Sequence, residues 1–174
     1  MRQNKNIDLV FLDTIHFEPG EILDFLMIFP FLKKEAIIIF HDIDQQITKP
    51  VGKDMRDEWA PYIIFNLIRG EKFLPSGPGI LNKEIGAIKL EKKQIRFIHD
   101  YCRALGSQWE YFPSETHIHL IFEFFKKYYD NICLTIFNES INFNRRFVKD
   151  NPKEFFYKRI KRNRKNLTIN DFKK

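Results

Sequence analysis

Four residues with metal-binding or proton-transferring side chains follow two apolar runs near the start of the chain. Asp13 ends the run IDLVFL, and His16 stands three residues later. His41 and Asp42 end the second run, AIIIF. Carboxylates bind hard divalent cations such as Mg²⁺ through oxygen, and histidine can accept a proton near neutral pH. These residue types therefore suit a cation site with a base beside it.

The two apolar runs predict the elements that position these side chains. Residues 7–12 are β-branched and aromatic and are apolar on both sides of the pleat, which predicts an interior parallel strand covered on both faces. Pro19 is tolerated in the first turn of a helix that Pro30 should break. Residues 36–40 predict a second buried strand. Ligands of open α/β sheets bind at the carboxyl ends of strands, so the four residues should lie together.

The predicted elements change from mixed to helical along the rest of the chain. They are a helix at 58–68, a strand at 85–90 and helices at 92–105, 115–129 and 131–147. Turn-forming residues crowd 70–79. We therefore expect an α/β part (1–90), a helical extension packed on it (91–150) and a basic tail (151–174).

The composition predicts a folded protein with one strongly basic end. With 44% hydrophobic and 30% charged residues, the chain is typical of globular proteins. The segment 145–174 holds 12 Lys/Arg against 3 Asp/Glu, which leaves 17 against 20 elsewhere. Such a tail can attract a polyanion, although no nucleic-acid motif is present and nucleic acid is not the expected partner. We find neither a secretory signal nor a membrane span, so a cytoplasmic location is expected.

The two cysteines, Cys102 and Cys133, are far apart in the sequence and lack the spacing of common metal sites. They predict buried free thiols in a reducing compartment. His99 is predicted to lie in a helix, where it and Asp100 would form a solvated pair. These residues therefore indicate no site of their own.

Residues 7–90 resemble the second half of class I S-adenosylmethionine-dependent methyltransferases. The likeness is strongest to the subgroup of cephalosporin hydroxylase-like proteins and sugar or glycan O-methyltransferases. The segments that carry it are IDLVFLD (7–13), His16, Glu21, LMIFPFLKK (26–34), AIIIFHD (36–42) and IGAIKL (85–90). The resemblance implies a partial Rossmann-like sheet of mostly parallel strands with crossover helices.

One part of the methyltransferase pattern has no counterpart in this chain. The family begins with a strand, a glycine-rich turn and an acidic residue on the next strand, which together hold S-adenosylmethionine. No G-x-G-x-G follows a predicted strand here, and the chain matches the family from about its fourth strand. We therefore expect a form that lacks the N-terminal cofactor-binding half and has weak or no activity alone.

The resemblance also suggests roles for single residues. It makes Asp13 and Asp42 the candidate ligands of a divalent cation such as Mg²⁺ and His16 the catalytic base. His41 stands where some relatives carry a carboxylate, and we assign it, with Trp59, to substrate binding. From the residues alone, both aspartates can equally cap loops or helices, His16 can bond to backbone, and Trp59 can pack in the core.

The functional expectation therefore has two forms. The first is a truncated O-methyltransferase that acts on a sugar or another small hydroxyl compound, with S-adenosylmethionine as the methyl donor. The second is a non-catalytic remnant or interaction module. Such a module would self-associate or bind a polyanion through its basic tail.

Overall fold

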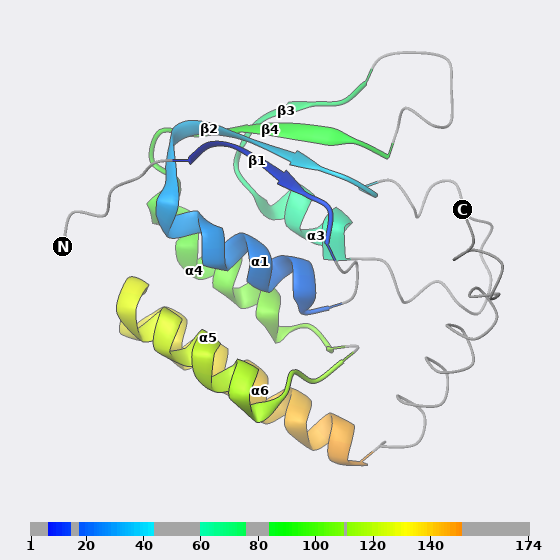
Figure 1. The fold of residues 1–174 in the computed structure, drawn as a ribbon, viewed down its shortest axis with the longest axis vertical. Helices are drawn as coiled ribbons and strands as arrows, with labels where there is room; N and C mark the ends of the chain where they lie inside the picture. The colour runs from blue at the N-terminus through cyan, green and yellow to red at the C-terminus, as the bar shows by residue number, and fades with distance from the viewer. Residues whose placement is uncertain (1–6, 15–17, 44–59, 76–83, 110, 151–174) are drawn as a thin grey trace, which may run out of the picture.

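The structure, a computed structural model, describes residues 7–14, 18–43, 60–75, 84–109 and 111–150. It is an α/β structure in which the described helices lie on one side of a four-stranded sheet (Figure 1). The strands are β1 (Ile7–Leu12), β2 (Leu32–Phe40), β3 (Gly70–Phe73) and β4 (Gly86–Leu90). The helices are α1 (Gly20–Ile28), α3 (Ala60–Leu67), α4 (Ile98–Arg103), α5 (Glu115–Tyr128) and α6 (Asn131–Asp150). The predicted α/β class is confirmed, and the basic tail lies outside the described residues.

The sheet is mixed, with the strand order β1-β2-β4-β3. β1 and β2 are parallel, whereas β4 runs antiparallel to both β2 and β3. The prediction of a mostly parallel sheet was therefore wrong. A parallel neighbour requires a long crossover, which α1 supplies only between β1 and β2. β3, which lies in the stretch predicted as turns, is followed directly along the chain by its antiparallel neighbour β4.

One face of the sheet faces solvent in the described part of the chain. Ile38 and Phe40 of β2 are fully buried against the helices, while Ile37, which points to the opposite face, is 40% exposed. On β1, Leu9 is 60% and Phe11 is 56% exposed. The prediction that β1 is covered on both faces was wrong for these residues, because the described helices all pack on one side and β1 forms an edge of the described sheet (Figure 1).

α1 and the short turn after it pack on α4 through aromatic side chains. Phe25 and Phe29 both make edge contacts with the Tyr101 ring, at centroid distances of 5.5 and 5.8 Å. α1 ends at Ile28, and Pro30 follows in a short 3₁₀ turn, as the sequence predicted. One hydrophobic cluster extends from β1 to α6. The helical extension is thus packed on the α/β part.

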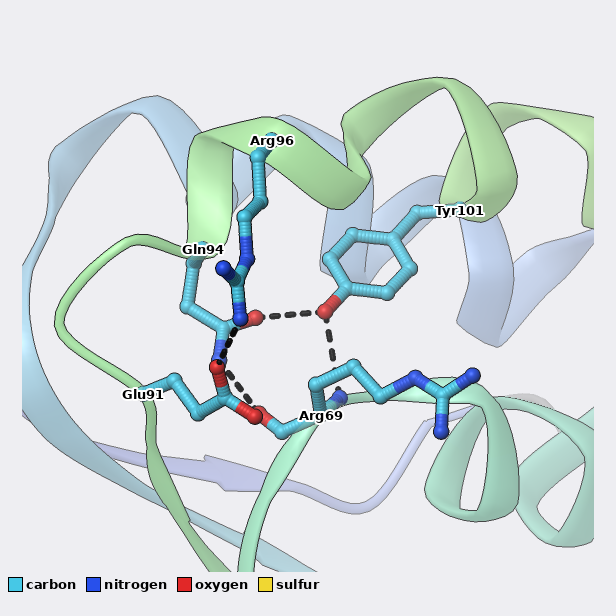
Figure 2. Close-up of polar contacts among 5 residues, drawn as sticks. All are labelled: Arg69, Glu91, Gln94, Arg96 and Tyr101. Carbon is cyan, nitrogen blue, oxygen red and sulfur yellow. Dashed lines mark hydrogen bonds and ion pairs between the residues drawn. The ribbon is translucent and has the colours of Figure 1, made fainter.

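The Tyr101 hydroxyl joins this core to the turn before β3 (Figure 2). It accepts a hydrogen bond from the backbone N–H of Arg69 at 3.1 Å and donates one to Oε1 of Gln94. The Gln94 amide in turn donates to the Arg69 carbonyl oxygen. Burial raises the pKa of Tyr101 to about 12. The hydroxyl therefore stays protonated at neutral pH and fixes the backbone from which β3 begins.

Replacing Gly70 by alanine should lower the free energy of unfolding by about 1–3 kcal/mol. A Cβ atom at this position would lie 2.3 Å from the backbone oxygen of Lys89 in β4. Because a backbone oxygen cannot turn aside as a side chain can, β3 would have to shift. Chemical denaturation measures the change. Gly106→Ala is the control, since its Cβ would meet no heavy atom within 4 Å. Equal losses in the two variants would contradict this account.

Candidate functional site

The carboxyl ends of β1 and β2 bring three of the predicted site residues together. The two strands are parallel with Leu12 opposite Phe40, so the next residues, Asp13 and His41, leave the sheet side by side. A hydrogen bond from the His41 backbone N–H to the Leu12 carbonyl oxygen, 3.1 Å long, extends the pairing to the point where the site begins. The parallel register therefore positions the site.

The imidazole of His41 lies within reach of two carboxylates. Its Nδ1 atom is 3.0 Å from Oδ2 of Asp42 and 3.5 Å from Oδ1 of Asp13. Nδ1 is itself buried, and among the described residues it makes no directed hydrogen bond. Both carboxylates are close enough to Nδ1 for electrostatic attraction, but neither carboxylate oxygen lies in the direction that a hydrogen bond requires. Buried polar atoms without a hydrogen-bond partner are rare in folded proteins, and a bound ion at Nδ1 would explain this one.

The backbone turns sharply at Asp42 to hold its side chain at the site. Its φ angle is 58°, in the left-handed region that few residues other than glycine adopt, although aspartate tolerates it. The next residue, Ile43, donates its N–H to the Glu84 carbonyl oxygen at 3.0 Å, which anchors the turn to the segment before β4. Asp42 is only 8% exposed. Strained backbone of this kind is concentrated at functional sites.

The three side chains fit a hard divalent cation. One ligand atom from each of Asp13, His41 and Asp42 lies within 4.8 Å of the other two. Two carboxylates and one imidazole leave positions for water or a substrate oxygen, as Mg²⁺ and Mn²⁺ sites commonly do. Asp13 is about half exposed, whereas the Asp42 side chain is 11% exposed, so a ligand could approach from the Asp13 side.

A cleft of about 370 Å³ lies beside this cluster. Its lining residues are Thr14, Gly20, Leu23, Asp24, Met27, Tyr111, Pro113, His117 and Ile121. Thr14 directly follows Asp13, so the cleft adjoins the strand ends. Burial raises the pKa of the Asp24 carboxyl, and its contact with the Thr14 hydroxyl partly opposes this shift. Asp24 was not among the predicted site residues, because a single acidic residue in an amphipathic helix gives no sequence signal.

Two predicted site residues, His16 and Trp59, lie outside the described residues. The structure thus brings together Asp13, His41 and Asp42, and it adds Asp24 and His117 along the neighbouring cleft. His117 was predicted to lie at a helix start, and it does so: its backbone N–H donates to Oγ of the capping residue Ser114 at 3.3 Å.

Comparison with protein-family models, with curated proteins and with solved structures finds no match for this chain. In the part of the chain that the structure describes, no helix is long and apolar enough to cross a membrane.

Proposed function

We propose that this chain forms the acceptor and cation side of an S-adenosylmethionine-dependent O-methyltransferase. The observation that carries the proposal is the cluster of Asp13, His41 and Asp42 at the ends of two parallel strands. This cluster lies where ligands bind in open α/β sheets. The substrate would be a sugar or another small compound with neighbouring hydroxyl groups.

The strand directions are compatible with this proposal. β4 lies between β2 and β3 and runs antiparallel to both, so β1, β2 and β3 point the same way. The carboxyl ends of β1 and β2, where the sequence resembles the methyltransferases, therefore lie side by side.

Each candidate site residue would then have its own role in binding the cation or the substrate. Asp13 and Asp42 would hold the cation, with His41 as a third ligand or as a contact to the substrate. A bound divalent cation would lower the pKa of a coordinated hydroxyl and orient it. His16, by resemblance, would take the proton, and Trp59 would border the substrate. The Asp24 carboxyl, whose pKa burial raises, can contact substrate hydroxyls in the adjoining cleft.

The cofactor side of the reaction has no counterpart among the described residues. No glycine-rich turn follows β1 or β2 in the sequence. The exposed apolar side chains of β1 and β2 offer a surface on which a further polypeptide unit could pack and bring that cofactor site. We assign no step to residues of this chain on the cofactor side.

Calorimetry with S-adenosylmethionine should therefore show at most weak binding to this chain, with or without Mg²⁺. The physical reason is that the adenosine and methionine moieties would lack a closed pocket, and small ligands bind tightly only when most of their surface is buried. Tight binding at one molecule per chain would overturn the assignment of the cofactor site to another unit. The acceptor side is tested separately by cation and diol binding, as described in the Discussion.

A second candidate function is a non-catalytic module that self-associates, and the exposed sheet face favours it. Leu9 and Phe11 stand on an edge strand of the described sheet, where backbone groups can also pair with another chain. Two copies could bury these side chains against each other.

The double variant Leu9→Lys/Phe11→Lys should then be shifted toward monomer in sedimentation analysis, because lysine is poorly accommodated in a buried interface. The matched control is Leu120→Lys/Phe143→Lys, since Leu120 is also 60% and Phe143 also 56% exposed but both lie on helices. The same shift in the control, or a monomeric parent protein, would remove the support for this candidate.

A further inference from the structure

Two helices on the far side of the core bring a second set of ligand-type side chains together. His99 and Cys102 lie three residues apart on α4, and Asp130 and Cys133 lie three residues apart at the start of α6. The two pairs are distant in sequence, and together they do not match the spacing of a familiar metal motif. The prediction that the two cysteines are buried free thiols is confirmed. Their spacing in the sequence did not predict the ligand-type side chains that lie beside Cys133.

Asp130 is held in place from two sides. Its Oδ1 atom accepts the backbone N–H of Cys133 at 3.0 Å, and its Oδ2 atom lies 2.7 Å from Nε2 of His99. These contacts lower the pKa of the Asp130 carboxyl, the Cys133 backbone hydrogen bond contributing most. The carboxylate is therefore ionised at neutral pH and aimed at both neighbours.

Cys133 is fully buried and completes the group. Ligand atoms of His99, Asp130 and Cys133 lie within 4.8 Å of one another. His99 and Asp130 are 33% and 53% exposed, so the group is open to solvent on their side and closed on the side of the sulfur. An imidazole, a carboxylate and a thiol at these separations form a ligand set of intermediate softness.

Cys102 stands behind this group and contacts the sulfur of Cys133. Its hydrogen bond to Cys133, its burial and the charge of Asp130 all raise the pKa of the Cys102 thiol. Cys102 therefore stays protonated at neutral pH beside the Cys133 sulfur. A donor on a ligand sulfur is the kind of outer partner that tunes metal sites.

We propose that His99, Asp130 and Cys133 bind a borderline-soft divalent cation such as Zn²⁺. On binding, the Cys133 thiol releases its proton to solvent, and His99 takes the tautomer that carries hydrogen on Nδ1, which frees Nε2 to coordinate. The 2.7 Å separation of Nε2 and Oδ2 must widen to about 3.3 Å, the ligand-to-ligand edge expected for zinc. Both side chains are exposed enough to make this movement. The fourth position faces solvent.

Titration of the reduced protein with Co²⁺ tests the proposal, because a thiolate bound to cobalt absorbs by charge transfer. The wild-type chain should develop this absorption with one Co²⁺ per chain, and added Zn²⁺ should abolish it. Cys133→Ser and His99→Ala should each lose it. His99 is partly exposed, so His99→Ala should leave the core intact. A lost spectrum in this variant therefore cannot be attributed to misfolding. Cys102→Ala leaves all three ligands in place, so it should keep the absorption, with an affinity about 10–100-fold weaker because an outer partner of the ligand sulfur is lost.

His41→Ala is the control, because it disturbs the other cluster and should leave the cobalt spectrum unchanged. Absence of the charge-transfer absorption in the folded wild-type protein would overturn the proposal. So would an undiminished spectrum in Cys133→Ser, or loss of the spectrum in His41→Ala but not in His99→Ala. The result is independent of the methyltransferase proposal, which concerns the strand ends alone.

Discussion

Replacing Trp109 by alanine should lower the free energy of unfolding by about 3–5 kcal/mol. The indole is fully buried and packs against Phe112 with the ring centroids 5.6 Å apart. Its Nε1–H donates to the Leu105 carbonyl oxygen at 2.9 Å. Alanine would leave a large cavity and a buried carbonyl oxygen without this donor. Chemical denaturation monitored by circular dichroism measures the loss.

The backbone of Trp109 is also tied to α6, and because the substitution keeps these hydrogen bonds, the expected loss comes from the indole alone. The Trp109 backbone N–H donates to Oδ1 of Asn144 on α6 at 2.7 Å, and the Asn144 amide donates to the carbonyl oxygens of Ser107 and Ser140. Trp109→Phe is the control, since it keeps an aromatic ring and removes the indole donor. It should lose clearly less stability than the alanine variant. A loss below about 1 kcal/mol in Trp109→Ala would contradict this view of the core.

Replacing Asp42 by asparagine should weaken binding of Mn²⁺ about 10–100-fold, because ligand charge is a main determinant of affinity for hard cations. Asparagine also tolerates the left-handed backbone that Asp42 adopts, so the φ angle of 58° can be kept. The substitution thus removes a charge and leaves the turn in place. Electron paramagnetic resonance of free Mn²⁺ measures the affinity.

Asp8→Asn is the matched control for the cation measurement. Asp8 lies near the start of β1, the strand that Asp13 follows, is 72% exposed and pairs with Lys33 at 2.8 Å. Its loss should leave Mn²⁺ affinity unchanged. An equal weakening in Asp8→Asn and Asp42→Asn would show that Mn²⁺ responds to the general charge of the surface and would contradict a site at the strand ends.

The sequence predicted the elements around the candidate site well because each has a strong local pattern. Ile7–Leu12 is a strand as predicted, and the second strand was correctly placed at 36–40. Its start was wrong: residues 31–34 were expected to form the last turn of the preceding helix, but the strand already begins at Leu32. Two lysines and a glutamate are exposed there, so no apolar alternation marks the strand.

Features that depend on packing between distant segments could not be predicted in the same way. Gly70–Phe73 forms an edge strand of mainly exposed residues, which carries no hydrophobic period. The exposed face of β1 follows from where the described helices pack, since its apolar residues equally suit a covered strand. His99 and Asp130 meet only because α4 and α6 pack together, and sequence separation conceals such a pair.

If the strand ends prepare a hydroxyl substrate through a divalent cation, a diol should bind there only when the cation is present. The most direct measurement is the change in backbone amide NMR shifts when a vicinal diol such as catechol is added with and without Mg²⁺. We expect shifts at Thr14, His41 and Asp42 that require Mg²⁺ and vanish in Asp42→Asn. Shifts that are the same without Mg²⁺, or no shifts at these residues when Mg²⁺ is present, would contradict it.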